Sequence, residues 1–127
     1  MDYAFFGSPE FAKIILEKLI VTDMPPALVV CNPDKPVGRK KIITPPPTKV
    51  VALTHDIQVL QPESLNETFN LKPLTLNLFD FFVVAAYAKI IPKNILDLPK
   101  LGTIGAHPSL LPKYRGVTPI QSVILSG

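Results

Sequence analysis

The first 31 residues place the strongest constraint on the fold. Two apolar runs, at residues 3–6 and 27–31, flank a segment whose apolar side chains recur at helical spacing through residue 21. Ser8, Pro9 and Glu10 suit a helix start, because a serine caps free N–H groups, a proline fits the first turn and a glutamate complements the helix dipole. A strand–helix–strand unit of this kind predicts parallel pairing with a right-handed crossover.

The rest of the chain extends the same alternation. We expect a long loop over 32–47, a helix over 48–55 capped by Thr48, a third strand over 57–60, and a central strand over 81–86 that is apolar on both faces. A short helix over 92–98, a strand over 103–106 and a final helix from Thr118 or Pro119 follow. Residues 61–78 carry no clear pattern. The sequence therefore predicts an α/β fold, a mostly parallel sheet with helices on both faces.

Composition limits the class of protein. The 127 residues suit one domain, and 47% hydrophobic with 18% charged residues describes a globular chain. The single cysteine, Cys31, lies in an apolar run, so we expect it to pack as a small hydrophobe without a disulfide. Because the chain shows no signal peptide and no run long enough to span a membrane, a reducing cytoplasm is the expected location.

The positive charge is concentrated in one stretch. The net charge of +3 would not by itself indicate nucleic acid, but five cations fall within the expected 32–47 loop and just after it: Lys35, Arg39, Lys40, Lys41 and Lys49. Five of the fifteen prolines lie in the same loop and stiffen it. The alternative is a solvated loop whose lysines only maintain solubility.

His107 follows directly after the strand expected at 103–106. Open parallel sheets present reactive groups at the carboxyl ends of their strands, and a histidine exchanges a proton near neutral pH. The placement predicts proton-transfer chemistry at this edge of the sheet. A histidine that only secures a turn is the alternative.

Four segments together resemble the amino-terminal region of the methionyl-tRNA formyltransferase family. They are residues 6–12 (Phe-Gly-Ser-Pro-Glu-Phe-Ala), 32–41 with 46–49, 84–92, and 107–116 (His-Pro-Ser-Leu-Leu-Pro-Lys-Tyr-Arg-Gly) with 119–121. The resemblance implies a Rossmann-like formyltransferase domain that transfers a formyl group from 10-formyltetrahydrofolate to the amino group of methionyl-initiator tRNA. It also implies that residues 1–127 are the amino-terminal part of that domain, with the downstream part and any carboxyl-terminal domain absent.

The resemblance assigns catalytic roles to a histidine, an asparagine two residues before it, and a downstream aspartate. His107 matches the first, Gly105 stands at the position of the asparagine, and the aspartate would lie beyond Gly127. Losing one donor aimed at an oxyanion costs about 2.7–4 kcal/mol of barrier. We therefore expect this chain alone to be inactive. Gly105 has an equally good structural reading, a strand end where another backbone passes closely.

The resemblance also implies two binding sites. The folate donor would contact residues from two segments, which are Tyr87, Ala88, Ile90, Ile91, Ser109, Leu110, Leu111 and Pro112, with Ala88 where the family commonly has glycine. For Ile90 and Ile91 a purely structural role in the core is equally favoured. The acceptor arm of the tRNA would contact Lys35, Arg39, Lys40 and Lys41, with Arg39 entering the groove.

Two other functions remain open. The same folate chemistry could act on an amino-sugar nucleotide or a purine ribonucleotide, although small acceptors need no basic loop. A non-catalytic tRNA- or folate-binding domain is the third hypothesis, which Gly105 supports. The absence of a G-x-G-x-x-G motif excludes dinucleotide binding, and no cysteine–histidine cluster has metal spacing. We expect a monomer without a metal.

Overall fold

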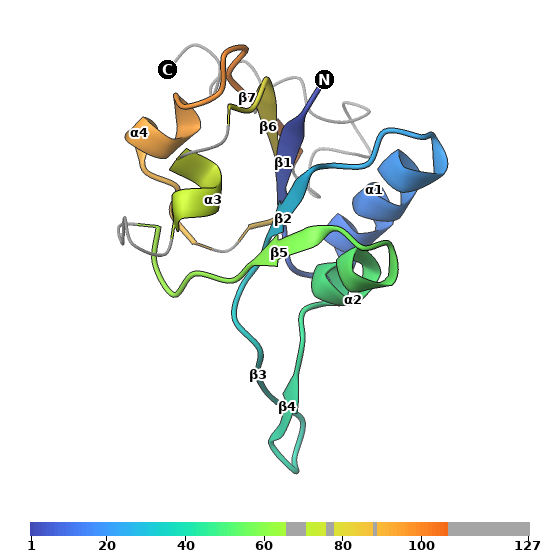
Figure 1. Cartoon of the computed structure of the whole chain (residues 1–127). Coiled ribbons are helices and arrows are strands. Elements are labelled where there is room, and N and C mark those ends of the chain that lie inside the picture. Colours follow the sequence, from blue (N-terminus) through green and yellow to red (C-terminus); the bar gives the residue numbers. More distant parts are fainter. Residues whose placement is uncertain (66–70, 76–77, 88, 107–127) are drawn as a thin grey trace.

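The fold is a five-stranded parallel sheet, given by a computed structural model that describes residues 1–65, 71–75, 78–87 and 89–106 (Figure 1). The strand order is β5-β2-β1-β6-β7, and each neighbouring pair is parallel. The strands are β1 Tyr3–Phe6, β2 Leu28–Val30, β5 Gln58–Leu60, β6 Phe81–Ala85 and β7 Thr103–Ala106. The predicted α/β fold and its parallel sheet are confirmed.

Helices cover both faces of this sheet. The helices α1 Glu10–Val21 and α2 Pro47–Thr54 pack together on one face, and α3 Lys72–Thr75 and α4 Lys93–Leu96 lie on the other (Figure 1). Helix α3 falls in the stretch that the sequence left unassigned. The expected final helix lies outside the described residues.

Alternation along β1 divides the core into two clusters. Tyr3 and Phe5 join the cluster under α1 and α2, whereas Ala4 and Phe6 join the cluster under α3 and α4. All four side chains are buried, because parallel strands covered on both faces leave no solvent side. Tyr3 stacks on Phe81 of β6 with ring centroids 4.8 Å apart, and this contact links neighbouring strands at their amino ends.

The expected 32–47 loop is wrong in part. Residues Lys35–Val37 form β3 and Ile42–Thr44 form β4, an antiparallel pair that projects beyond the carboxyl edge of the sheet (Figure 1). A four-residue turn closes it, with positive φ at Gly38 and at Lys41, 78° and 53°. We call residues 35–44 the basic hairpin.

Two predicted helix caps are also wrong. Pro9 is the N-cap of α1 and Pro46 that of α2, and neither helix start has a side-chain cap. Ser8 Oγ instead accepts a hydrogen bond from the Asn32 backbone N–H at 2.9 Å, and the Thr48 hydroxyl donates to the Gly7 carbonyl at 2.7 Å. Both hydroxyls therefore attach a helix start to a neighbouring segment, because those buried polar groups need partners.

Candidate functional site at the carboxyl edge of the sheet

The order in which strands are added to the sheet reverses between β1 and β6. From β1 the sheet grows one way through β2 to β5, and the other way through β6 to β7. In open α/β sheets ligands bind beyond the carboxyl ends of the strands at such a switch point. The loops after β1, β2 and β6 meet at this place.

A pocket of about 480 Å³ lies at this switch point. Its walls come from the turn after β1, the segment after β2, both limbs of the basic hairpin, and the residue that follows β6; they include Ser8, Asn32, Val37, Pro45, Pro46 and Ala86. Prolines and aliphatic groups make most of this lining apolar. We call it the switch-point pocket; its shape suits a flat or apolar part of a ligand.

Gly7 directly precedes Ser8, which lines this pocket. Its N–H donates to the Val30 carbonyl at 2.9 Å, and its carbonyl accepts the Thr48 hydroxyl. A Cβ here would lie 2.4 Å from the Ala85 carbonyl oxygen and 2.6 Å from the Ala12 Cβ. Only glycine lets β1, β6 and α1 approach this closely, which is how the sequence positions the pocket.

The chain leaves β6 through an unusual backbone conformation. Ala86 has a φ of 56°, in the left-handed region that a side chain disfavours. This residue both lines the switch-point pocket and redirects the chain toward Tyr87. Left-handed alanines are uncommon and concentrate at binding sites, where the surrounding structure holds them in place.

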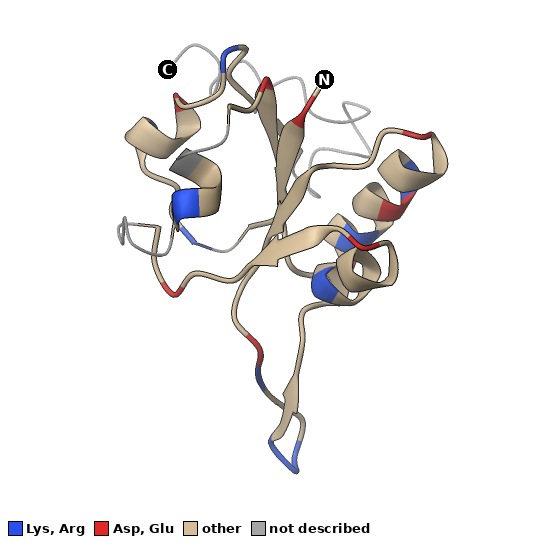
Figure 2. Ribbon diagram, viewed as in Figure 1, with Lys and Arg blue, Asp and Glu red and all other residues tan. Residues whose placement is uncertain are grey.

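The predicted RNA-binding cations all lie on the basic hairpin. Lys35, Arg39, Lys40 and Lys41 are exposed, and the tip of the hairpin forms a continuous positive end (Figure 2). Within the part of the chain that the structure describes, none of the four makes an ion pair. Lys49 differs, since it pairs with Asp34. Among the described residues, four of the five cations are thus available to an outside ligand, whereas Lys49 is paired with Asp34.

The predicted folate residues are only partly described. Tyr87 and Ile91 pack against the cluster under α3 and α4, and the side chain of Ile90 is 90% exposed. Burial raises the pKa of the Tyr87 hydroxyl to about 12. Among the described residues this buried hydroxyl has no hydrogen-bond partner, and the Tyr87 ring meets Phe6 edge to face with centroids 5.6 Å apart. Ala88, Ser109, Leu110, Leu111 and Pro112 lie outside the described residues.

Of the predicted catalytic pair, the structure describes Gly105. It is buried in β7 and pairs in register with Val84, which belongs to the cluster under α3 and α4. Paired residues in a sheet point to the same face, so a side chain at position 105 would lie on the face that holds Tyr87 and Ile91. His107 lies outside the described residues, one position beyond the end of β7.

Several pocket residues were missed from the sequence. Ser8, Asn32 and Ala86 lie one or two positions after the ends of β1, β2 and β6, which was the available signal, because strand ends on parallel neighbours meet at one edge. The prolines at 45–47 were interpreted as stiffening the expected loop, and their place in the pocket wall was missed. Among the described residues there is no cluster of metal-ligating side chains, and no described helix is long and apolar enough to cross a membrane.

Fold and pocket define the class: an open parallel α/β domain with a pocket at its topological switch point. Residues 1–127 match the sequence profile of the formyl transferase family, so the chain belongs to this family. A relative from Caldicellulosiruptor saccharolyticus named methionyl-tRNA formyltransferase is 51% identical over 130 residues, which cover all of this chain and 42% of the relative. A Staphylococcus epidermidis protein of the same name is 49% identical over 97% of this chain and 39% of its own length.

The resemblance inferred from the four sequence segments is thereby confirmed. The chain spans about two fifths of the length of these relatives.

Proposed function

We propose that this chain is the amino-terminal part of an enzyme that transfers a formyl group from 10-formyltetrahydrofolate to the amino group of methionyl-initiator tRNA. The basic hairpin carries this proposal. It projects from the edge of the sheet that holds the switch-point pocket, and it exposes Lys35, Arg39, Lys40 and Lys41. The printed names of the relatives support the same substrate.

Charge explains why the hairpin suits RNA. Phosphates along a nucleic-acid backbone attract lysine and arginine and position the protein on the helix. Four unpaired cations on a narrow arm can follow such a backbone while the pocket at its base receives the end of the strand. A nucleotide-sized acceptor would fit within the pocket and would leave the hairpin tip without a ligand.

The folate donor would supply the formyl carbon when bound. On this proposal Tyr87, Ala88, Ile90 and Ile91 with Ser109, Leu110, Leu111 and Pro112 surround its flat ring. Of the described members, Ile90 offers the most apolar surface, and Tyr87 and Ile91 support the wall from the core. A flat heterocycle fits walls of this kind.

Proton transfer on this proposal belongs to His107, which would accept a proton as the amine attacks the formyl carbon and would return it to the folate nitrogen as the bond between that nitrogen and the formyl carbon breaks. Position 105 carries no side chain, so it donates no hydrogen bond to the developing oxyanion. Of the histidine and the asparagine that the resemblance places before Gly127, the chain therefore holds only the histidine. Because its substrate on this proposal is an aminoacylated tRNA, we place the protein in the cytoplasm.

A chimaera tests the activity. Residues 1–127 replace the aligned segment of the Caldicellulosiruptor saccharolyticus relative, and formylation of charged initiator tRNA is measured with and without Gly105→Asn. We expect slow turnover that Gly105→Asn raises about 100- to 1,000-fold, since it restores one oxyanion donor. Absence of turnover in both chimaeras, beside an active parent relative, would refute the enzyme proposal.

Filter binding tests the hairpin. Arg39→Ala should weaken binding of an acceptor-arm RNA duplex and reduce the slope of log Kd against log salt by about 0.7–0.9, the value for one lost phosphate contact. Lys18→Ala, an exposed change on α1, is the matched control and should leave both unchanged. Equal affinities for Arg39→Ala and the unmodified chain would exclude the hairpin as the RNA contact.

One observation favours a second function. Gly105 removes a catalytic donor and leaves the hairpin and pocket intact, as a tRNA- or folate-binding domain without catalysis would require. The two experiments separate the cases, because a binding domain retains the salt-dependent affinity while its chimaera does not turn over after Gly105→Asn.

A further inference from the structure

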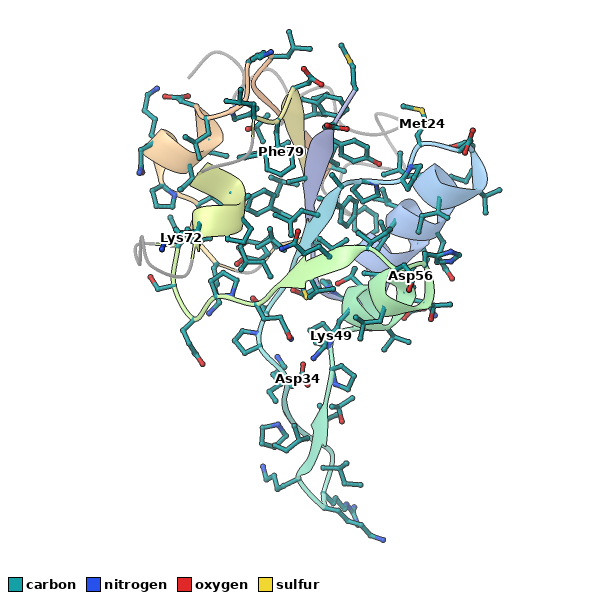
Figure 3. All side chains as sticks on the ribbon, in the orientation of Figure 1. Met24, Asp34, Lys49, Asp56, Lys72 and Phe79 are labelled. Atoms are coloured by element: carbon teal, nitrogen blue, oxygen red, sulfur yellow. The ribbon has the colours of Figure 1, made fainter. Side chains whose placement is uncertain are left out.

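Three side chains meet at the base of the basic hairpin. Lys49 Nζ lies 3.1 and 3.2 Å from the two carboxylate oxygens of Asp34, and Gln61 Nε2 donates to Asp34 Oδ1 at 2.7 Å. The same Gln61 nitrogen donates to the Asn32 carbonyl at 3.0 Å. Figure 3 shows Asp34 and Lys49 facing each other where the two limbs leave the body of the protein. We call Asp34, Lys49 and Gln61 the hairpin clamp.

The clamp joins three separate parts of the chain. Asp34 immediately precedes β3, Lys49 lies in the first turn of α2 after the hairpin returns, and Gln61 directly follows β5. Helix α2 is itself attached to the sheet, because the Thr48 hydroxyl bonds to the Gly7 carbonyl. The outgoing limb is therefore connected through Lys49 and Gln61 to two elements outside the hairpin, α2 and the end of β5.

Within the described part of the chain, apolar packing does not hold the tip of the hairpin. Val37, Ile42 and Ile43 are all exposed, and the hairpin extends away from the rest of the protein (Figure 1). Polar contacts at its base must then set its direction. A single exposed ion pair adds little, but a bidentate pair that also receives an amide donor has a defined geometry.

The clamp also removes one cation from the basic stretch. The Gln61 amide and Lys49 ammonium hold the pKa of Asp34 below its ordinary value, so this carboxylate stays ionised beside Lys49. The Lys49 side chain is only 22% exposed. Lys49 is thus engaged within the protein, unlike the four cations further along the hairpin.

We propose that Asp34, Lys49 and Gln61 are positioning residues that fix the direction of the basic hairpin, and that Lys49 does not contact RNA phosphates. The part concerning RNA rests on the proposed function. If the hairpin already has its bound direction before the RNA arrives, less conformational entropy is lost on binding. Loss of the clamp should weaken binding while the bound contacts, and hence the salt dependence, stay the same.

Spin-label distances test the positioning without any RNA. Labels are placed at Lys40→Cys on the hairpin tip and Lys18→Cys on α1, in a Cys31→Ala background. We expect one narrow distance peak in this parent, loss of that peak in Gln61→Ala and Lys49→Met, and its retention in Lys49→Arg, which conserves the charge. A narrow, unshifted peak in both Gln61→Ala and Lys49→Met would overturn the proposal.

RNA binding at two salt concentrations tests the rest. Gln61→Ala and Lys49→Met should each raise the Kd for an acceptor-arm duplex about 2- to 10-fold at both salts, the ordering cost of one or two side chains. Lys40→Met is the matched loss of one charge and should reduce the salt slope by about 0.7–0.9. The same slope reduction in Lys49→Met would overturn the assignment of Lys49, and an unchanged Kd after peak broadening would overturn the link to RNA. If the unmodified chain binds no RNA, the proposed function fails while the spin-label result still decides on the clamp.

Discussion

Gly7→Ala is the sharpest test of how the switch point is built. The added methyl group would lie 2.4 Å from the Ala85 carbonyl oxygen and 2.6 Å from the Ala12 Cβ, both below the 3.0 Å limit that Cβ contacts respect. The first of these neighbours is backbone, so a strand or helix must shift. Overpacking of this kind costs about 1–3 kcal/mol.

The shift also affects two hydrogen bonds. The Gly7 N–H donates to the Val30 carbonyl, and the Gly7 carbonyl accepts the buried Thr48 hydroxyl. Weakening them adds about 1 kcal/mol. We therefore expect Gly7→Ala to lower the free energy of unfolding by about 3 kcal/mol, or the Tm by about 10 °C.

Urea unfolding followed by circular dichroism measures this change. Gly38→Ala is the matched control, because nothing lies within 4 Å of its Cβ position and only its positive φ of 78° disfavours a side chain. That variant should lose about 1 kcal/mol. If Gly7→Ala loses no more than Gly38→Ala, close approach at Gly7 does not determine the geometry of the switch point.

Two further substitutions and one chemical modification test other contacts of the core. Thr48→Val leaves the Gly7 carbonyl without its buried donor and should cost about 1–3 kcal/mol, whereas Thr48→Ser keeps the hydroxyl; equal stability of the two variants in urea would contradict this. Tyr87→Phe removes a buried hydroxyl that has no partner, so unfolding should show unchanged stability or a gain of up to about 1 kcal/mol; a clear loss would indicate a partner outside the described residues. Burial raises the pKa of the Cys31 thiol from near 9 to about 11, so its contribution to stability is complete below pH 9 and is lost as the pH rises through 11. At pH 8 an aromatic disulfide reagent should modify Cys31 much more slowly in the folded chain than in urea, and equal rates would show that the thiol is accessible.

The sheet could be predicted because its signals are local. Runs such as 3–6 and 81–85 are apolar on both faces and each follows an aspartate, Asp2 or Asp80, as expected of buried parallel strands. The helical spacing after Pro9 likewise predicted α1 through its last residue, Val21, although the predicted cap was wrong. In each case burial by the fold and local preference agree.

The hairpin could not be predicted in this way. Its strands are exposed, contain Pro36 and carry charge, so neither alternation nor apolar content marks them. Its turn depends on positive φ at Gly38 and Lys41, which spacing does not reveal. The expectation of a stiffened loop without strands therefore missed the antiparallel pair.

The candidate site was predicted by residue type more than by geometry. The four cations were predicted correctly to gather on one exposed segment, and their role in RNA binding stays a prediction. Ser8 and Thr48 were assigned to local caps, but their partners are 24 and 41 residues away along the chain. Local rules cannot supply such tertiary partners, and the pocket that they frame was missed with them.

The two limbs of the basic hairpin also form one wall of the switch-point pocket. A ligand in the pocket would contact Lys35, Val37 and Thr44, in the limbs of the hairpin whose tip an RNA would contact, so any coupling between the two ligands would pass through these limbs. If the first ligand changes the affinity of the second by some factor, thermodynamic reciprocity requires that the second changes the affinity of the first by the same factor. The affinity of the basic hairpin for its ligand then depends on whether the switch-point pocket is occupied, and the reverse holds equally.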